Sequence, residues 1–221
     1  MVKLKSDPLN IYLILFCLTL LSSCASFSQT VDQTTYENQS TTINNLNKEI
    51  ERLNQELDDI AGSRANLFRA KSDLEKSMAQ ELLAGNLSVN MGERGLVVTV
   101  LDRVLFGSGQ IEVKPSAYET LDKVADVLAQ KAHGHMVYIE GHTDNIPIRN
   151  SGWRSNWELS TARALEVLHY FIDQKGLDPD RFAATGFGQF QPVSGNQSSE
   201  GRMKNRRVEI VISPKKSDSH D

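Results

Sequence analysis

Three polar sequence blocks, each beside a predicted strand or helix, constrain the fold of this 221-residue chain most strongly. The first block, GHTDN at residues 141–145, directly follows an apolar strand pattern. The second block, residues 155–164, opens with SNWE, a capping box whose serine and glutamate satisfy amides at the start of a helix. The third block, residues 201–210, joins a basic cluster to another apolar strand pattern. Strand, loop and helix therefore alternate in the C-terminal half of the chain.

This alternation predicts an α+β domain over residues 92–213. Strands are predicted where apolar and β-branched residues cluster, at residues 96–101, 136–140, 182–186 and 208–212. One helix is predicted to begin near Pro115 with the capping box SAYE. A second helix is predicted from Ser155 to about Gln174. The order β-α-β-α-β-β predicts two layers, a small sheet with both helices packed on it.

A further helix with a heptad stripe is predicted upstream, over residues 42–85. Its apolar residues recur at alternating steps of three and four, as in a coiled coil: Ile43, Leu46, Ile50, Leu53, Leu57 and Ile60. The stripe weakens past Gly62, because Arg64 and Lys71 occupy positions of the repeat that should be apolar. Two interpretations stay open. Residues 43–60 form a homodimeric coiled coil, or a single amphipathic helix folds back on its own domain.

The N-terminus has the pattern of a lipoprotein signal peptide over residues 1–23. Two lysines precede an apolar run at residues 11–21, which is shorter than the roughly 20 residues that a membrane-spanning helix needs. The run ends in LSSC, which resembles a bacterial lipobox, so Cys24 is expected to become the lipidated first residue of the mature chain. Ordinary secretory cleavage after small residues is the alternative. Cys17 leaves with the signal, so no disulfide is expected.

Two polar segments flank the predicted elements. Residues 24–41 are rich in Ser, Thr, Gln and Asn and have no apolar period, so they are predicted to form a flexible tether. Residues 214–221 form a polar tail.

The composition excludes several classes of function. With 39% hydrophobic and 24% charged residues the chain is typical of globular proteins, and its net charge of −4 argues against nucleic-acid binding. His142, Asp144 and Ser160 are hydrolase residue types, but the G-x-S-x-G nucleophile motif is missing from the sequence. Neither an H-x-x-x-H pair nor a cysteine of the mature chain is available to bind a metal. We therefore expect no enzyme, no metal site and no cofactor.

Asp144 and Arg163 are the residues whose chemistry best suits a small zwitterion. Asp144 follows a strand end and can bind an ammonium group, although loop acids are commonly solvated or hold a turn. Arg163 shares a helix face with Asn156 and Ser160, and its planar guanidinium can bind a carboxylate through two hydrogen bonds. Backbone amides near Asn145 and Asn156 would add donors. The alternatives are a solvent-facing arginine and a structural salt bridge between Asp144 and Arg163.

In this order and spacing the three blocks resemble the OmpA-like domain, a periplasmic module that binds peptidoglycan, over roughly residues 94–213. The resemblance implies that Asp144 binds the diaminopimelate of the peptide stem and that Arg163 binds the diaminopimelate carboxylate. Thr143 and Asn156 are placed to add neutral hydrogen bonds to the same ligand.

The resemblance also bears on three residues for which two interpretations stay open. Phe106 is expected either to form a wall beside the ligand or to belong to the core. Arg206 and Arg207 are expected either to contact acidic peptide or glycan, or to support the sheet and its loops by hydrogen bonding.

The leading functional interpretation is a Pal-type lipoprotein of the outer membrane that faces the periplasm. It would tether the envelope to peptidoglycan through diaminopimelate. Ala25 follows the predicted lipidated cysteine, whereas lipoproteins retained in the inner membrane usually carry Asp at that position.

The alternative interpretation rests on GHTDNIPI at residues 141–148, which is closer to the flagellar stator protein MotB. Stator proteins carry a proton-accepting acid within a membrane span. Here the apolar run is short and Asp7 precedes it, so the stator role itself is disfavoured. The alternative is therefore a regulatory or motor-associated protein whose helix, residues 43–83, binds a protein partner.

Overall fold

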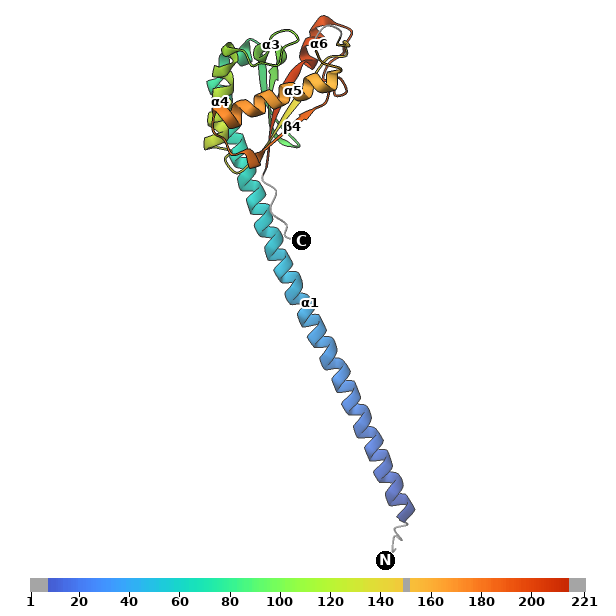
Figure 1. The fold of residues 1–221 in the computed structure, drawn as a ribbon. Helices are drawn as coiled ribbons and strands as arrows, with labels where there is room; N and C mark the ends of the chain where they lie inside the picture. Colours follow the sequence, from blue (N-terminus) through green and yellow to red (C-terminus); the bar gives the residue numbers. More distant parts are fainter. Residues whose placement is uncertain (1–7, 149–151, 215–221) are drawn as a thin grey trace, which may run out of the picture. The chain divides into compact units, whose positions relative to one another are not determined.

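The computed structural model describes residues 8–148 and 152–214, with side chains from residue 33 onward. The chain divides into two compact units, residues 1–56 and 57–221, and helix α1, Pro8–Ser77, contributes residues to both (Figure 1). The lysines of the predicted signal peptide, the side chain of Cys24 and residues 215–221 of the predicted tail lie outside what is described. Among the described helices, none combines the length and the apolarity that crossing a membrane requires.

In the first unit, α1 continues through residues 24–41, where the sequence predicts a flexible tether. A helix satisfies its own backbone hydrogen bonds, so a polar helix can be built without an apolar face. The hydroxyls of Thr41 and Thr42 each donate 2.8 Å hydrogen bonds to carbonyls one turn earlier. Further along, Arg52 forms ion pairs with Glu49 and Glu56 on the same helix.

The heptad stripe of α1 is exposed to solvent in this chain. Its side chains keep between 42% and 63% of their accessible surface: Ile43, Leu46, Ile50, Leu53, Leu57 and Ile60. Four later residues of the chain are instead completely buried in the second unit: Leu67, Ala70, Leu74 and Met78. The two interpretations of the helix therefore apply to different segments. Residues 67–78 pack on the domain, and residues 43–60 present the apolar stripe.

The second unit is built on a five-stranded mixed sheet with strand order β1-β2-β5-β3-β4. The strands are β1 (Leu87–Gly92), β2 (Gly95–Leu101), β3 (Met136–His142), β4 (Phe182–Gly186) and β5 (Arg207–Ser213). Neighbours pair antiparallel except β3 and β4, which pair parallel. The predicted α+β class is confirmed, and four of the strands match the predicted ones.

Strand β1 is an addition to the predicted order. Leu87, Val89 and Met91 alternate with polar residues, and a tight hairpin pairs them with β2, with Val89 opposite Val98. The segment LSVNMG is short and lacks the run of β-branched residues that marks the other strands, so its sequence pattern does not predict a strand.

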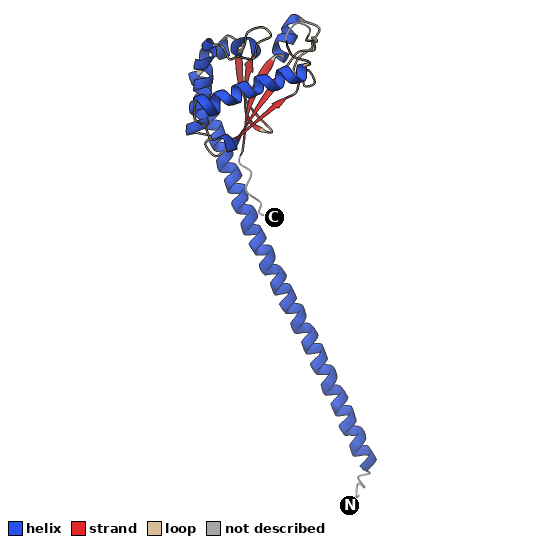
Figure 2. Ribbon diagram, viewed as in Figure 1, coloured by secondary structure: helices blue, strands red, loops and turns tan. Residues whose placement is uncertain are grey.

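Helices cover one face of this sheet. The main ones are α4 (Tyr118–Gln130) and α5 (Asn156–His169), with a π-helical continuation at Tyr170–Gln174. Figure 2 shows α5 lying across the strands. Shorter helices are α2 (Ala79–Leu83), α3 (Asp102–Leu105), α6 (Ser199–Asn205) and the 3-10 turns Pro115–Ala117 and Pro179–Arg181. The core forms between sheet and helices, where Val98, Ile139 and Ile210 meet Leu121 and Val167.

The two predicted capping boxes have different outcomes. At the start of α5, the Ser155 hydroxyl accepts a hydrogen bond from the Glu158 amide at 3.3 Å, as predicted, whereas the Glu158 carboxylate accepts from the Arg154 amide at 2.7 Å. The predicted box at Ser116 is not formed, because Ser116 lies inside the 3-10 turn Pro115–Ala117 and the residue that precedes α4 is Ala117, which has no capping side chain. Proline still starts this turn, since its missing N–H costs nothing at a first helical position.

Candidate functional site

Glycine at position 141 brings α5 against the end of β3. A Cβ atom at Gly141 would lie 2.0 Å from the Ser160 carbonyl oxygen, so no larger residue fits between this strand and α5. The polar residues that follow β3 are thereby placed beside the N-terminal half of α5.

Asp144 is buried at the end of β3 and pairs with an arginine of the third sequence block. Its carboxylate accepts a 3.0 Å hydrogen bond from the Ile146 amide, which fixes the turn, and it forms an ion pair with Arg206. The predicted alternative of a structural salt bridge to Arg163 is therefore wrong, because each residue is paired elsewhere.

Arg163 is also buried, on the inward face of α5, and has three contacts. Its Nη1 lies 2.9 Å from Oδ1 of Asp102, and its Nε donates to the Gln110 carbonyl at 3.0 Å. The guanidinium carbon lies 5.1 Å from the centre of the Phe106 ring. Burial lowers the pKa of Arg163, and the Asp102 carboxylate counteracts this shift. The alternative of a solvent-facing arginine is wrong, because Arg163 is buried.

Asp102, at the start of α3, is a site residue that the sequence analysis missed. Its backbone amide donates to the Arg206 carbonyl at 3.0 Å, which ties the end of β2 to the residue before β5. Burial raises the pKa of Asp102, and the cations of Arg163, Arg206 and Lys114 oppose that rise. Asp102 directly follows the predicted strand at residues 96–101, and Asp144 likewise comes soon after a predicted strand. This position was the signal that could have identified Asp102.

These residues line an open pocket of about 680 Å³. Six of the eight predicted binding residues line it: Phe106, Thr143, Asp144, Asn156, Arg163 and Arg206. Asp102, Arg103 and Lys114 add charge to the lining. Asn145 and Arg207 do not line it. The pocket therefore carries two acid–arginine pairs, Asp102 with Arg163 and Asp144 with Arg206.

The neutral residues of the pocket hold its loops together. The Asn156 amide donates to the carbonyls of Asp144 and Ile146, each at 3.2 Å, and to the side chain of Gln189 at 3.0 Å. The Thr143 hydroxyl donates to the Asp144 carbonyl at 3.0 Å. These side chains therefore fix the loop that carries Asp144.

Phe106 belongs to the core and also lines the pocket. It is 1% exposed, and the Arg163 guanidinium lies over its ring.

Arg206 and Arg207 point in different directions. Arg206 keeps 38% of its side-chain surface and reaches Asp144 in the pocket. Arg207 is buried, binds Glu209, and donates to the carbonyls of Asn205 and Gln191, each at 3.2 Å. Successive residues of an extended segment face opposite sides, so neighbouring arginines take different roles. The contacts of Arg207 agree with the interpretation of sheet and loop support.

A second charged cluster lies on the other face of the sheet. Oxygen and nitrogen atoms of Glu140, His142 and Glu209 lie within 4.8 Å of one another, a spacing that a metal ion could use. Guanidinium groups already neutralise both acids, because Arg94 binds Glu140 at 2.9 Å and Arg207 binds Glu209. The arrangement therefore favours a structural ion-pair network over a metal site.

His142 is the neutral member of this cluster. Its ring stacks on Phe187 with centroids 5.2 Å apart, and neither ring nitrogen has a hydrogen-bond partner among the described residues. Burial lowers the pKa of His142 to about 4, and the nearby Arg207 adds to this shift.

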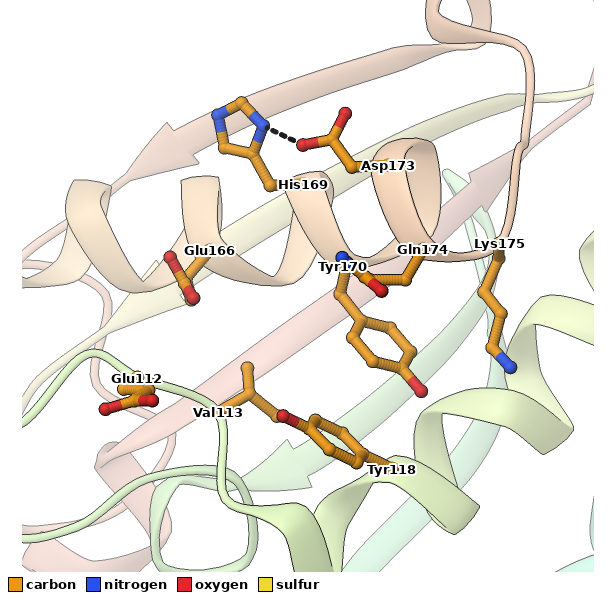
Figure 3. Close-up of a pocket in the computed structure, with 9 residues that line it drawn as sticks. All are labelled: Glu112, Val113, Tyr118, Glu166, His169, Tyr170, Asp173, Gln174 and Lys175. Carbon is orange, nitrogen blue, oxygen red and sulfur yellow. Dashed lines mark hydrogen bonds and ion pairs between the residues drawn. The ribbon is translucent and has the colours of Figure 1, made fainter.

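Another pocket, of about 470 Å³, lies between α4 and α5 (Figure 3). Tyr118 and Tyr170 stack there with centroids 5.2 Å apart. Two of its charged groups form ion pairs: His169 lies 3.0 Å from Asp173, and Lys175 bonds to Asp122. Because neither pair is buried, in contrast to Asp102 with Arg163, we assign the functional site to the pocket of Asp144 and Arg163.

Residues 105–206 match the model of the OmpA family. This part of the chain is an OmpA-family domain, which agrees with the resemblance drawn from its three blocks. The family is not one of enzymes.

Relatives and a solved structure extend this likeness. The chain is 36% identical to Motility protein B of Bacillus subtilis (strain 168), over 70% of this chain and 59% of that protein. It is 32% identical to the Probable lipoprotein YiaD of Escherichia coli (strain K12), over 64% and 63%. It is 38% identical to the Peptidoglycan-binding protein ArfA of Mycobacterium tuberculosis (strain ATCC 25618 / H37Rv), over 49% and 32%.

The crystal structure of a putative MotB-like protein from Desulfovibrio vulgaris is similar, with a TM-score of 0.63 and 28% identity over 72% of this chain and 99% of that one. The chain spans less than two thirds of the length of the curated relatives compared.

Proposed function

We propose that this chain binds peptidoglycan non-covalently, by holding the zwitterionic end of diaminopimelate in the pocket of Asp144 and Arg163. The observation that carries the proposal is that two acids, the buried Asp144 and the largely buried Asp102, line one pocket with two arginines. A free diaminopimelate stereocentre presents an ammonium and a carboxylate side by side. Two acids and two guanidinium groups match both charges of such a ligand.

The two arginines would take different parts in binding. Arg163 is held by Asp102, the Gln110 carbonyl and the Phe106 ring, so its guanidinium is already oriented. Arg206 is more exposed and is bound to Asp144 by one ion pair. The ligand ammonium would replace Arg206 on Asp144, and the ligand carboxylate would bridge Arg206 and Arg163. Charge neutrality is then kept in the pocket at each stage.

The relatives support this proposal and its setting. ArfA is named as a peptidoglycan-binding protein, and YiaD as a probable lipoprotein. We further propose that Cys24 carries acyl chains and anchors the mature chain in the outer membrane, facing the periplasm as a Pal-type tether. LSSC before Ala25 supports that anchor.

A second candidate function is favoured by the likeness to Motility protein B and by the exposed stripe of α1. In this case the chain is a regulatory or motor-associated protein, and residues 43–60 bind a protein partner. If the chain is instead a peptidoglycan tether, the same residues would form a homodimer. Co-purification from crosslinked envelopes separates the two functions, because a stoichiometric heterologous protein on this helix supports the second one.

Co-sedimentation with purified sacculi tests the binding proposal. The full-length chain, purified in detergent, is mixed with diaminopimelate-type sacculi and with lysine-type sacculi, whose stems lack the carboxylate beside the side-chain ammonium. We expect sedimentation with the first kind and a strong reduction with the second. Equal binding to both kinds of sacculi would show that the arginines do not bind this carboxylate.

A further inference from the structure

A pair of exposed aromatic rings lies beside the pocket. Trp157, in the first turn of α5, stacks on Phe190 with ring centroids 5.0 Å apart and an angle of 22° between the rings. The two residues keep 48% and 62% of their surface. Exposed apolar groups that lie together on a polar surface commonly mark a binding site.

The loop that carries Phe190 is fixed by hydrogen bonds to the elements of the pocket. The Gly188 amide donates to the Ser160 hydroxyl at 3.0 Å, and the Gly188 carbonyl accepts from the Thr143 amide at 2.8 Å. Gly188 has a φ of +55°, which favours glycine, and a Cβ atom at this position would lie 3.5 Å from the Trp157 ring. The aromatic pair is therefore held in place before any ligand arrives.

Asn156 joins the aromatic pair to the pocket. It precedes Trp157 and donates to the carbonyl of Asp144, while the same amide donates to Gln189, which precedes Phe190. Each ring thus directly follows a partner in the Asn156–Gln189 hydrogen bond, and Asn156 also lines the pocket. A polymer whose end is bound in the pocket can therefore leave the pocket beside these rings.

We propose that Trp157 and Phe190 bind the glycan strand of peptidoglycan, as a second subsite beside the diaminopimelate pocket. The inference rests on the proposed function, because the pocket ligand is what brings the glycan near. The apolar face of a pyranose presents C–H groups, which suit the negative face of an aromatic ring. The side-chain amides of Asn156 and Gln189, the residues directly before the two rings, bond to each other and suit sugar hydroxyl or acetamido groups.

The length of the peptide stem fits this arrangement. Few residues separate diaminopimelate from the sugar, and three extended residues span at most about 10 Å. The glycan must therefore run close to the pocket, where an aromatic surface can reach it. The stacked tyrosines Tyr118 and Tyr170 line a different pocket, so they do not compete for this role.

Two ligands that differ only in the glycan provide the test. One is the stem tripeptide ending in diaminopimelate, and the other is the same tripeptide joined to a disaccharide of N-acetylated hexosamines. Calorimetry on the full-length chain in detergent compares both ligands with wild type and with a Trp157→Ala/Phe190→Ala variant. Phe68→Ala, which removes another half-exposed ring of the same unit, is the matched control.

We expect the disaccharide to tighten binding to wild type about five- to tenfold, and the double variant to lose this gain while binding the tripeptide as before. The control should keep the gain. If wild type binds both ligands with equal affinity, or if the double variant also binds the disaccharide ligand more tightly, the glycan subsite is overturned while the pocket ligand still binds. A variant that changes only the oligomeric state would assign the rings to a second copy and also overturn it. If wild type binds neither ligand, the proposed function fails together with the subsite.

Discussion

Arg163 is held by Asp102, with 2.9 Å between Nη1 and Oδ1, in the interior between α5 and α3. The acid that the sequence placed beside it, Asp144, is bound instead by Arg206. The pocket therefore contains one buried pair that the fold needs and one more exposed pair that a ligand can open. We therefore expect substitution of Asp144 to affect mainly binding, and substitution of Arg163 to affect stability as well.

Asp144→Asn should abolish binding while leaving the fold in place. The change keeps the shape but removes the charge that faces an ammonium group, at a cost to binding of about 2–5 kcal/mol. Arg206, its partner, is partly exposed and can be solvated instead. Sacculus co-sedimentation beside a thermal melt measures both properties. Asp126→Asn makes the same charge change on an exposed position of α4 and should bind normally. Normal sedimentation of folded Asp144→Asn would exclude this acid from the site.

Arg163→Ala should instead destabilise the fold as well as binding. Removing the guanidinium leaves Asp102 buried without its ion-pair partner, which costs about 3–5 kcal/mol. Arg206→Ala should cost less, because Arg206 is itself partly exposed and the Ile146 amide still donates to the Asp144 carboxylate. Urea unfolding of both variants measures the difference. Adding Asp102→Asn to Arg163→Ala should recover part of the lost stability, because the orphaned charge is removed. Equal stability of the two arginine variants would contradict the assigned roles.

The stability of the domain should fall as the pH drops from about 6.5 towards 4. Burial holds the pKa of His142 near 4 in the folded chain, so the folded state binds fewer protons than the unfolded state between these values. The stability from this group is present above the unfolded pKa and is lost on acidification, by about 1–3 kcal/mol in total. Burial also lowers the pKa of His135, which adds a slope of the same sign.

Denaturation curves across this pH range compare wild type with His142→Phe, which keeps an aromatic ring against Phe187 but cannot titrate. The variant should show a shallower loss of stability. An unchanged slope in His142→Phe would show that His142 does not control this dependence.

Leu53→Asp should prevent self-association through α1. A carboxylate in the centre of the stripe would be buried on dimer formation, which is unfavourable without a partner. Gln55→Asp adds the same charge on the far side of the heptad and should leave association intact. Light scattering on the full-length chain in detergent, over a range of concentrations, gives the mass. A wild-type monomer at high concentration would remove the homodimer and favour a heterologous partner for the stripe.

Cys24→Ala should release the chain from the membrane. Two or more acyl chains give stable membrane association, and the variant has no thiol at that position to carry them. Intact-mass measurement of the wild-type mature chain should show cleavage before Cys24 and added lipid mass. Cleavage at another residue without lipid would contradict the anchor.

Local sequence patterns were sufficient for most elements of the fold. Apolar strand runs identified β2, β3, β4 and β5, and the Ser155 capping box marked the start of α5. These features depend on neighbouring residues, so periodicity and side-chain type carry the information. Strand β1 was missed because its stability comes from pairing with β2. The stretch of α1 over residues 24–41 was missed because no apolar period marks it.

The sequence by itself determined the class of the domain, the blocks that surround its pocket and the residue types that suit a zwitterion. Only the tertiary structure decided which acid meets which arginine, since Asp102 and Arg163, or Asp144 and Arg206, are more than 60 positions apart in the sequence. The structure also separated Arg206 from Arg207, because neighbouring residues at the start of a strand face opposite sides. Ion pairing depends on distance and burial in space, which residue order does not specify.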